Sequence, residues 1–365
     1  MIKYFALLLP LILFYPFFGL PFVIFYYIVY FYNCRKPKII SSNDSLDRQF
    51  LEKRFFPFIL GFNFVLQTLI DKFRFIKEKR NMFYLTNNDG GRFSVTVSEN
   101  ETLENIIIIH GFASSCDSTY VVNFEKKLKE NNYRVFCMNM RGVQCELETP
   151  EFFHIGYTKD LKFLIEYIIE NYQGNISLLG FSLGGSWITK FLGEYSDKNF
   201  MKRIKCGMAI SSPLDFHHIS KLETNLLHKL TINRIVANKL KQFILKYPII
   251  YKHCNLSEND VQNLSITQDI DENITMKIFN YSTMEEYYIK NSAVTNMHLI
   301  NKPVLIIISE DDMVSPLNKK ILKACENNKN IILVITKRGG HIGFYGNDLS
   351  QSYIEGAVLD FLKYH

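Results

Sequence analysis

Apolar positions along the chain fall into short continuous runs that alternate with longer stretches of helical periodicity. Runs of this kind, rich in Ile, Val and Leu, are typical of strands covered on both faces of a sheet. Eight such runs occupy residues 82–86, 92–97, 105–112, 133–140, 175–182, 204–212, 303–310 and 330–336. Helical patterns lie between them, as at 123–132, 159–172 and 184–195. The alternation predicts an α/β fold with a mostly parallel eight-stranded sheet, right-handed crossovers and helices on both faces.

Residues 213–300 interrupt this alternation. They are rich in Asn and Lys and have a helical rather than a strand-like periodicity. Because they separate two predicted strands, we interpret about 213–300 as a helical cap inserted over the carboxyl edge of the sheet. Residues 81–365 would then form one domain that includes the cap.

The amino-terminal residues 1–34 have a different pattern, because no charged residue occurs between positions 4 and 32. About 20 apolar residues span a bilayer as a helix, so the stretch predicts a single-pass membrane anchor. A cleaved signal peptide is the alternative, but it would end at a small-x-small cleavage site, which we do not find. Pro10, Pro16 and Pro21 leave room for a kinked span or a re-entrant hairpin.

The formal net charge is +6, and its distribution says more than its size. Residues 35–80 hold eleven Lys and Arg against five Asp and Glu, whereas the rest of the chain is close to neutral. A nucleic-acid-binding protein would carry its basic stripe on the folded domain, so we expect no nucleic-acid partner. We interpret 35–80 as a basic amphipathic segment beside a membrane. The overall content of 47% hydrophobic and 21% charged residues supports a sizeable core and argues against a disordered chain.

One serine stands among glycines where an apolar run ends, in "SLLGFSLGGSW" at residues 177–187. A G-x-S-x-G sequence between a strand and a helix is typical of a nucleophile elbow, in which the serine takes a strained conformation. The flanking residues must be tiny so that strand and helix can approach, and Gly180, Gly184 and Gly185 meet that need. Ser182 is therefore the candidate nucleophile.

A serine hydroxyl needs a base, and the base needs an acid that orients it. His341, in "KRGGHIGFYG" after the last predicted strand, is the candidate base. The acid is expected after the preceding strand, where "SEDDMVSP" makes Asp312 the best candidate and Asp311 the runner-up. The order Ser182, Asp312, His341 is that of the α/β-hydrolase fold.

The oxyanion of the tetrahedral intermediate requires backbone N–H donors. We assign this role to the amides of Phe112, in the loop after the first parallel strand, and Leu183, after the nucleophile. His110 is expected to brace the same loop. The chemistry needs no metal and no organic cofactor, and the seven cysteines show no zinc-ligand spacing.

Several motifs in order carry a more specific resemblance, from about residue 55 to the carboxyl terminus. They are "FFPFILGFNFVLQT", "DGG", "HGF…Y", "NMRGVQCELETPEFFHIGYTKDL", "GFSLGG", "SSPLDF", "STMEEYY", "SEDDMVSP" and "GGHIGF". In these the sequence resembles the YheT-type α/β-hydrolase family (AB hydrolase superfamily type 4), in its branch of membrane-anchored lipid esterases. The chain departs from the family pattern at residues 113–115 and 143–145, which would reshape the acyl pocket without removing a catalytic atom.

The resemblance implies a serine esterase or lipase that acts on acylglycerols or phospholipids, with Ser182, Asp312 and His341 as its triad. We therefore expect a membrane-anchored hydrolase of lipid acyl esters, including lysophospholipids. An acyl-protein thioesterase is the alternative within enzymes, and a catalytically silent lipid-binding or interaction protein is the alternative from another class. The sequence leaves open the oligomeric state and the identity of the membrane, although the endoplasmic reticulum is favoured.

Overall fold

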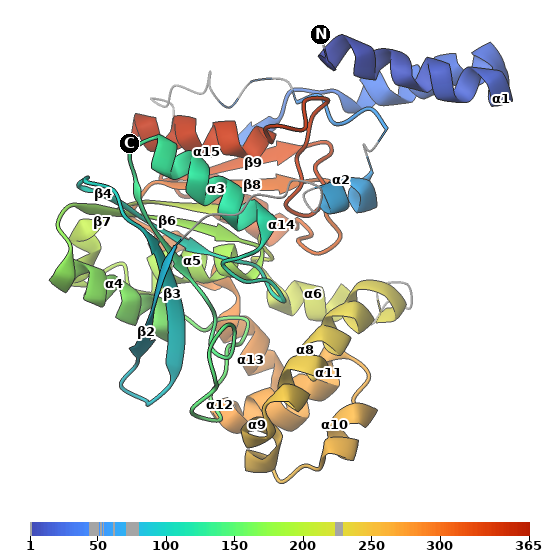
Figure 1. Ribbon diagram of the computed structural model, residues 1–365. Coiled ribbons are helices and arrows are strands. Elements are labelled where there is room, and N and C mark those ends of the chain that lie inside the picture. The colour runs from blue at the N-terminus through green and yellow to red at the C-terminus, as the bar shows by residue number, and fades with distance from the viewer. Residues whose placement is uncertain are drawn as a thin grey trace.

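A single sheet forms the frame on which the other elements are placed. The computed structural model describes residues 2–43, 51, 53, 55–60, 63–70, 80–222 and 229–365. Within these residues nine strands form one sheet in the order β1-β9-β8-β7-β6-β4-β5-β3-β2 (Figure 1). The strands are β1 (Lys38–Ile40), β2 (Asn81–Thr86), β3 (Arg92–Ser98), β4 (Glu104–Ile109), β5 (Arg134–Met138), β6 (Asn175–Phe181), β7 (Ile204–Ile210), β8 (Val304–Ser309) and β9 (Ile331–Thr336). All neighbouring pairs from β5 to β9 are parallel, whereas the β1–β9, β3–β5 and β2–β3 pairs are antiparallel.

The sheet has one strand more than the sequence predicted. Strand β1 pairs with the outer edge of β9, with Ile39 opposite Val334. It is only three residues long and follows directly after the amino-terminal apolar segment, so it has no run of its own to reveal it. The prediction of eight strands was therefore wrong, because it did not include this edge strand.

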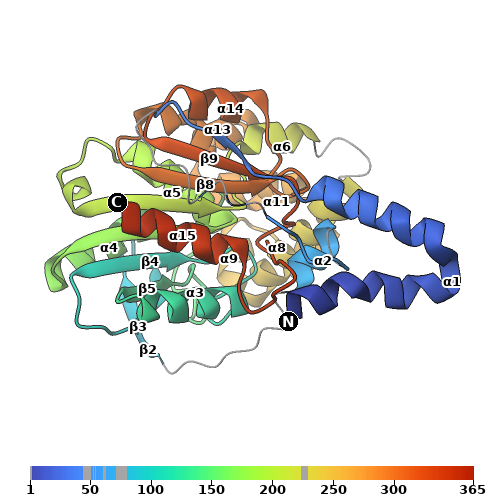
Figure 2. The ribbon, with the colours of Figure 1, turned by 90° about the horizontal axis from the view of Figure 1, so that it is seen from above.

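Both faces of the central strands are buried, which explains their continuous apolar sequences. Successive residues of β4, from Ile106 to Ile109, are fully buried and alternate between two core clusters on opposite faces. Helices α3 (Thr119–Glu130) and α15 (Tyr353–Tyr364) pack on one face, in front of the sheet in Figure 2. Helices α4 (Lys159–Asn171), α5 (Leu183–Glu194) and α14 (Lys319–Glu326) pack on the other face.

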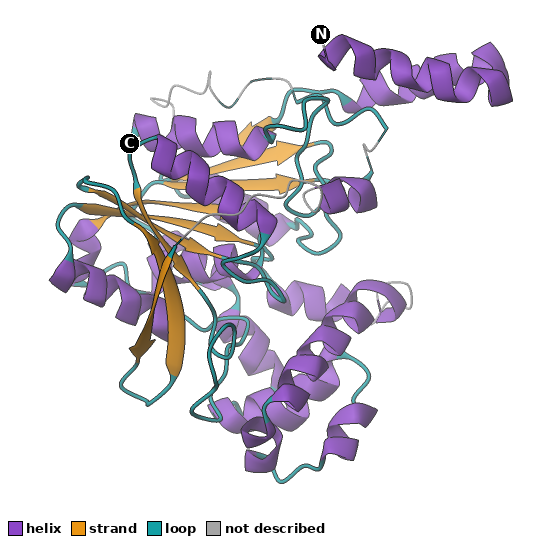
Figure 3. Cartoon of the chain, viewed as in Figure 1, coloured by secondary structure: helices purple, strands orange, loops and turns teal. Residues whose placement is uncertain are grey.

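The chain between β7 and β8 forms a group of short helices with its own apolar core (Figure 3). Its described residues form the α-helices α6 (Phe216–Leu222), α8 (Arg234–Lys246), α9 (Pro248–His253), α10 (Glu258–Asn263), α11 (Thr267–Ile270), α12 (Met276–Phe279) and α13 (Met284–Asn291). The Tyr247 hydroxyl donates to the carbonyl oxygens of Gly142 at 2.7 Å and Cys145 at 3.1 Å. The insertion is thus joined to the loop that follows β5.

The amino-terminal helix α1 (Ile2–Asn33) is bent back on itself at Gly19, which has φ 75° and ψ 173° (Figure 2). Among the described residues, no helix combines the length and apolar character needed to cross a membrane. The single-pass anchor expected at residues 1–34 therefore stays a prediction.

Helix α2 (Phe64–Ile70) follows α1 in the described part of the chain. Much of the basic segment predicted at 35–80 lies outside the described residues, namely 44–50, 52, 54, 61–62 and 71–79. In Figures 1 and 2, α1 and α2 lie beyond the end of the sheet toward which β8 and β9 point.

Candidate active site

Ser182 stands at the sharp turn between β6 and α5. Its backbone has φ 51° and ψ −120°, a conformation that L-residues rarely adopt, and its N–H donates to the carbonyl oxygen of Ile210 at 2.8 Å. This hydrogen bond to the end of β7 fixes the turn from the neighbouring strand. Strain of this kind persists where the surrounding structure holds it, and it is common at functional sites.

The glycines around Ser182 are required by close backbone approach. A Cβ at Gly180 would lie 2.4 Å from the carbonyl carbon and oxygen of Gly184, and a Cβ at Gly184 would lie 2.4 Å from the carbonyl oxygen of Ile109. A Cβ at Gly185 would lie 1.9 Å from the Ser212 hydroxyl oxygen. Helix α5 can therefore begin directly beneath the strands only because all three positions lack a side chain.

The structure brings Ser182, His341 and Asp312 together. His341 Nε2 lies 2.8 Å from Ser182 Oγ, and His341 Nδ1 lies 2.9 Å from Asp312 Oδ2. Asp312 follows β8 and His341 follows β9, so parallel strands deliver all three residues to the same edge of the sheet. When Nδ1 donates to the carboxylate, Nε2 has a lone pair free to accept the serine proton.

Asp312, rather than Asp311, is the carboxylate that contacts the histidine. Asp312 Oδ1 also accepts hydrogen bonds from the N–H groups of Val314 at 2.9 Å and Ser315 at 3.2 Å, which fix the carboxylate in place. Asp311 instead accepts a hydrogen bond from Gly340 N–H at 3.1 Å, and burial raises the pKa of its carboxyl above the usual range. The sequence could not separate these two neighbours, because both follow the same strand.

His341 is partly exposed, whereas Ser182 and Asp312 are buried. The His341 side chain is 14% exposed, whereas that of Asp312 is fully buried. A carboxylate shielded from water interacts more strongly with a cationic imidazole. The arrangement can thus stabilise the charge that forms on the histidine when it takes a proton.

The predicted oxyanion donors, Phe112 and Leu183, belong to the loop after β4 and to the start of α5. A Cβ at Gly111 would come within 3.1 Å of Ser182 Cβ, so the loop after β4 passes directly beside the serine. The Gly111 N–H donates to the Tyr120 hydroxyl at 2.8 Å. The next amide along this loop is that of Phe112. Leu183 is the first residue of α5, where an N–H has no acceptor within the helix.

The imidazole of His110 braces this loop from within. His110 Nδ1 lies 2.7 Å from the Gly111 carbonyl oxygen, and Nε2 accepts from Met140 N–H at 3.3 Å. Burial lowers the pKa of this histidine to about 4, so the ring is neutral at ordinary pH. The sequence places Tyr120 only within the motif "HGF…Y". Its hydrogen bond with Gly111 was not predicted.

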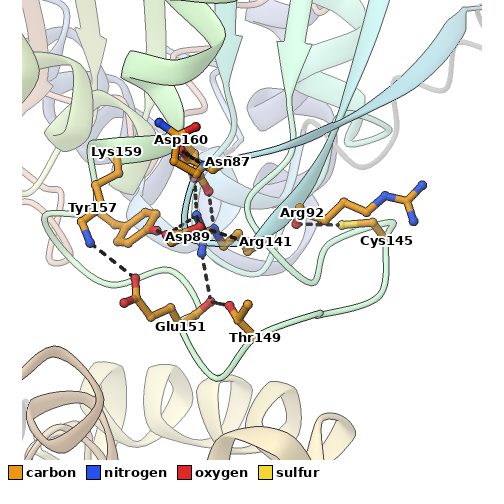
Figure 4. Close-up of polar contacts among 12 residues, drawn as sticks. Asn87, Asp89, Arg92, Arg141, Cys145, Thr149, Glu151, Tyr157, Lys159 and Asp160 are labelled. Carbon is orange, nitrogen blue, oxygen red and sulfur yellow. Dashed lines mark hydrogen bonds and ion pairs between the residues drawn. The ribbon is translucent and has the colours of Figure 1, made fainter.

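An ionic network around the buried Arg141 supports the loop that follows β5 and contacts the insertion (Figure 4). Arg141 donates to both carboxylate oxygens of Asp160 at 2.7 Å and, through one terminal nitrogen, to Asp89 at 2.8 and 2.9 Å. Asn87 adds a hydrogen bond to Asp160 at 2.9 Å. The network joins the β2–β3 turn, the loop after β5 and the start of α4, which explains why the "DGG", "NMRG" and "KDL" motifs occur together.

Metal-ligating residues do not gather elsewhere in the described part of the chain. Within it, no group of three or more His, Cys, Asp or Glu side chains is arranged to hold a metal ion. The adjacent His217 and His218 lie at the start of α6, half-buried, and His217 Nε2 is 3.6 Å from a Glu285 oxygen.

The fold and the Ser–His–Asp arrangement define a class, the α/β-hydrolases with a serine nucleophile. Residues 100–341 match the family described as serine aminopeptidase, S33, and this protein belongs to that family. The matched region runs from β4 to His341 and so contains the whole candidate site.

Relatives and solved structures agree with this class. The chain is 27% identical over 270 residues to monoacylglycerol lipase ABHD2 of Danio rerio, a match that covers 70% of this chain and 59% of that protein. It is 26% identical over 334 residues to phospholipase ABHD3 of Bos taurus, covering 85% of this chain and 79% of that protein. The esterase Pf2001 of Pyrococcus furiosus has the same fold, with a TM-score of 0.53, 18% identity, and coverage of 78% of this chain and 90% of that one. The protein is accordingly a serine hydrolase of the esterase and lipase type.

Proposed function

We propose that this protein hydrolyses the acyl esters of lipids at a membrane surface, through an acyl-enzyme on Ser182. The observation that carries the chemistry is the continuous contact from Ser182 Oγ through both ring nitrogens of His341 to Asp312. It is the arrangement required to remove a proton from the serine and return it to the leaving group.

The reaction would proceed in two halves. Ser182 Oγ attacks the ester carbonyl while His341 Nε2 takes its proton, and the amides of Phe112 and Leu183 hold the oxyanion. The protonated histidine then gives its proton to the leaving alcohol, and the acyl group stays on the serine. Water, deprotonated by the same histidine, releases the fatty acid and restores Ser182.

The choice of lipid esters rests on the relatives and on the resemblance to YheT-type hydrolases. One relative is named a monoacylglycerol lipase and another a phospholipase, so the substrate class we propose is an acylglycerol or a phospholipid, including a lysophospholipid. An apolar acyl chain would enter between the sheet edge and the insertion, where aromatic rings gather. The Phe153 ring contacts both Phe112 and Phe243, with centroid distances of 6.1 Å and 4.9 Å.

Membrane association is supported by the exposed surface of the amino-terminal segment. In the arm of α1 after Gly19, the large apolar side chains exposed to solvent are Leu20, Phe22, Ile24, Phe25, Ile28, Phe31 and Tyr32. Helix α2 adds Val65, Leu66 and Leu69. An exposed apolar surface of this extent marks a binding site for apolar partners, and the excess of basic residues at 35–80 would favour an anionic lipid surface.

The proposal is tested with the purified full chain and its Ser182→Ala variant. We expect the wild type to react with a fluorophosphonate probe and to release fatty acid from monoacylglycerol or lysophospholipid vesicles, and the variant to do neither. Equal labelling of both proteins would contradict the assignment of Ser182. Hydrolysis of an acyl-protein thioester but of no lipid ester would contradict the lipid substrate and favour a thioesterase.

A further inference from the structure

The loop that carries His341 is held by residues from the amino-terminal segment, far away in the sequence. This histidine loop comprises residues 337–348, between β9 and α15. Helix α2 lies against it so closely that a Cβ at Gly340 would be 2.8 Å from Gln67 Cβ, and a Cβ at Gly343 would be 2.2 Å from the Gln67 carbonyl oxygen. The close approach of α2 therefore explains why residues 340 and 343 are glycines.

The histidine loop is strained on both sides of His341. Gly340 has φ 61°, Ile342 has φ 70° and Phe344 has φ 54°. A positive φ at a β-branched residue such as Ile342 is a true outlier, because its branched side chain crowds the backbone. A loop with this conformation needs outside contacts to keep it.

Thr68 of α2 contacts the backbone of the catalytic histidine itself. The His341 N–H donates to Thr68 Oγ1 at 2.9 Å, and the threonine hydroxyl donates in turn to the Phe64 carbonyl oxygen at 2.7 Å. The hydroxyl is thus fixed as an acceptor for this one N–H. On the next residue, Ile342 N–H donates to Ser211 Oγ at 3.0 Å, so the histidine lies between two hydroxyl acceptors.

Gln67 holds the far side of the loop. Its side chain is fully buried, its Nε2 donates to the Tyr345 carbonyl oxygen at 3.0 Å, and its Oε1 accepts from the Tyr345 N–H at 2.8 Å. One amide therefore pairs with both polar backbone groups of a single loop residue. A buried amide paired in this way is a costly group to lose, because both backbone partners would be left unsatisfied.

Further contacts tie the loop to the rest of the amino-terminal segment. Arg338 Nε donates to Asn33 Oδ1, at the end of α1, at 2.7 Å. The Ile59 N–H donates to Asn347 Oδ1 at 2.8 Å. The histidine loop is thus gripped at residues 338, 341, 345 and 347 by side chains and backbone that all come from residues 33–68.

We propose that Thr68 and Gln67 are positioning residues for the catalytic base, so that the amino-terminal segment is part of the catalytic apparatus. The inference rests on the proposed acyl-enzyme chemistry, in which His341 Nε2 must stay within hydrogen-bond distance of Ser182 Oγ. Neither residue contacts the reacting atoms; they act by fixing the backbone on which the imidazole is carried. A displacement of about 1 Å at such a site costs on the order of 100-fold in rate.

The test compares three variants of the full chain on a soluble short-chain ester. Thr68→Val keeps the shape but removes the acceptor of the His341 N–H, whereas Thr68→Ser keeps the acceptor. Thr102→Val is the matched control, since Thr102 Oγ1 also accepts a backbone N–H, that of Glu104 at 3.0 Å, at the opposite end of β4. We expect Thr68→Val to lower kcat about 10- to 100-fold with little change in KM, and the other two variants to stay within about threefold of the wild type.

A Thr68→Val enzyme with the kcat of Thr68→Ser would overturn the proposal. If Thr68→Val does not fold, Thr68→Cys provides a weak acceptor at the same position. The kcat of Thr68→Cys should then be lower than that of Thr68→Ser but still measurable. Amide hydrogen exchange of the 337–348 peptide is measured alongside, and it should accelerate in Thr68→Val but not in Thr68→Ser or Thr102→Val. A wild type that reacts with neither ester nor probe contradicts the proposed function, and unchanged exchange in Thr68→Val contradicts the positioning role independently.

Discussion

At the scale of single residues, the site depends on the glycines around Ser182, because a side chain at these positions would collide with the backbone or with Ser212. Ser182 can take its strained conformation because α5 begins against the carbonyl groups of β4, and Gly184 is the point of closest approach. The carbonyl oxygen of Ile109 cannot move away, because it belongs to the centre of the sheet.

Replacing Gly184 with alanine should displace α5 and with it the serine. The added Cβ would meet the Ile109 and His110 carbonyl oxygens at 2.4 Å and 2.7 Å, far inside van der Waals contact. We expect a loss of about 2–4 kcal/mol in the free energy of unfolding, measured by denaturant titration, and loss of most esterase activity.

Gly356→Ala is the matched control on another helix. A Cβ there would meet only the flexible Gln351 side chain, at 3.8 Å. Since alanine favours a helix over glycine by about 0.5–1 kcal/mol, this variant should be slightly stabilised and fully active. Equal destabilisation by the two substitutions would contradict the close-packing explanation.

The sequence could predict the residues that perform chemistry better than those that place them. Ser182 and His341 stand in glycine-rich motifs after strands, so their type and position were both informative. Gln67 and Thr68 end the motif "FFPFILGFNFVLQT", which contributed to the family resemblance but gave neither residue a role. Their role depends on a loop more than 270 positions away, which no local pattern encodes.

At the scale of elements, the strands of the sheet were predictable because burial on both faces leaves uninterrupted apolar runs. The predicted ends extended beyond the real ones where the strand passes into a site loop, as at 110–112 after β4 and at 139–140 after β5. The first residue of each extension is polar and braces a loop: His110 Nε2 accepts from Met140 N–H, and Asn139 Oδ1 accepts from Cys116 N–H at 2.8 Å. Strand β1 was missed for the opposite reason, since three residues carry too little pattern.

The helical insertion contains a buried acid whose titration should be measurable. Asp271 is buried, and although the Tyr288 hydroxyl donates to it at 2.8 Å, burial raises the pKa of its carboxyl to about 6. A carboxyl with a raised pKa in the folded state binds its proton more tightly there than in the unfolded chain. Its protonation therefore stabilises the fold fully below the ordinary pKa of 3.8, and that stabilisation is lost as pH rises through about 6.

Asp271→Asn should remove this part of the pH dependence. Between pH 4 and pH 7 the wild type should lose about 2–3 kcal/mol more stability than the variant, as judged from melting curves across this range. Glu272→Gln changes the exposed neighbour and should follow the wild type. A variant curve parallel to that of the wild type would show that Asp271 does not titrate in this range.

At the scale of the whole molecule, the apolar surface and the active site are at the same end of the sheet. Helices α1 and α2, which carry the exposed apolar side chains, lie beyond the carboxyl ends of β8 and β9, from which Asp312 and His341 follow (Figure 2). A molecule that contacts a lipid surface through this end would present its catalytic edge close to that surface.

Vesicle binding tests the proposed membrane contact. Combined Phe25→Ser and Ile28→Ser substitutions should reduce co-sedimentation of the purified protein with anionic vesicles several-fold, because both side chains are exposed and apolar. The matched control combines Leu103→Ser and Ile235→Ser, which are exposed to a similar extent on other elements and should leave binding unchanged. Binding should also weaken as salt is raised, since the basic residues of 35–80 are screened. Equal binding by both double variants would argue against this surface.

The short strand β1 has a consequence for shortened forms of the protein. It covers the outer edge of β9, whose backbone donors and acceptors would otherwise face solvent as a template for strands of other molecules. A chain cut after residue 40 to improve handling would bare that template and also lose Asn33, the partner of Arg338. Self-association of such a fragment would then result from the uncovered edge of β9. Low activity of the fragment would say little about the intact enzyme.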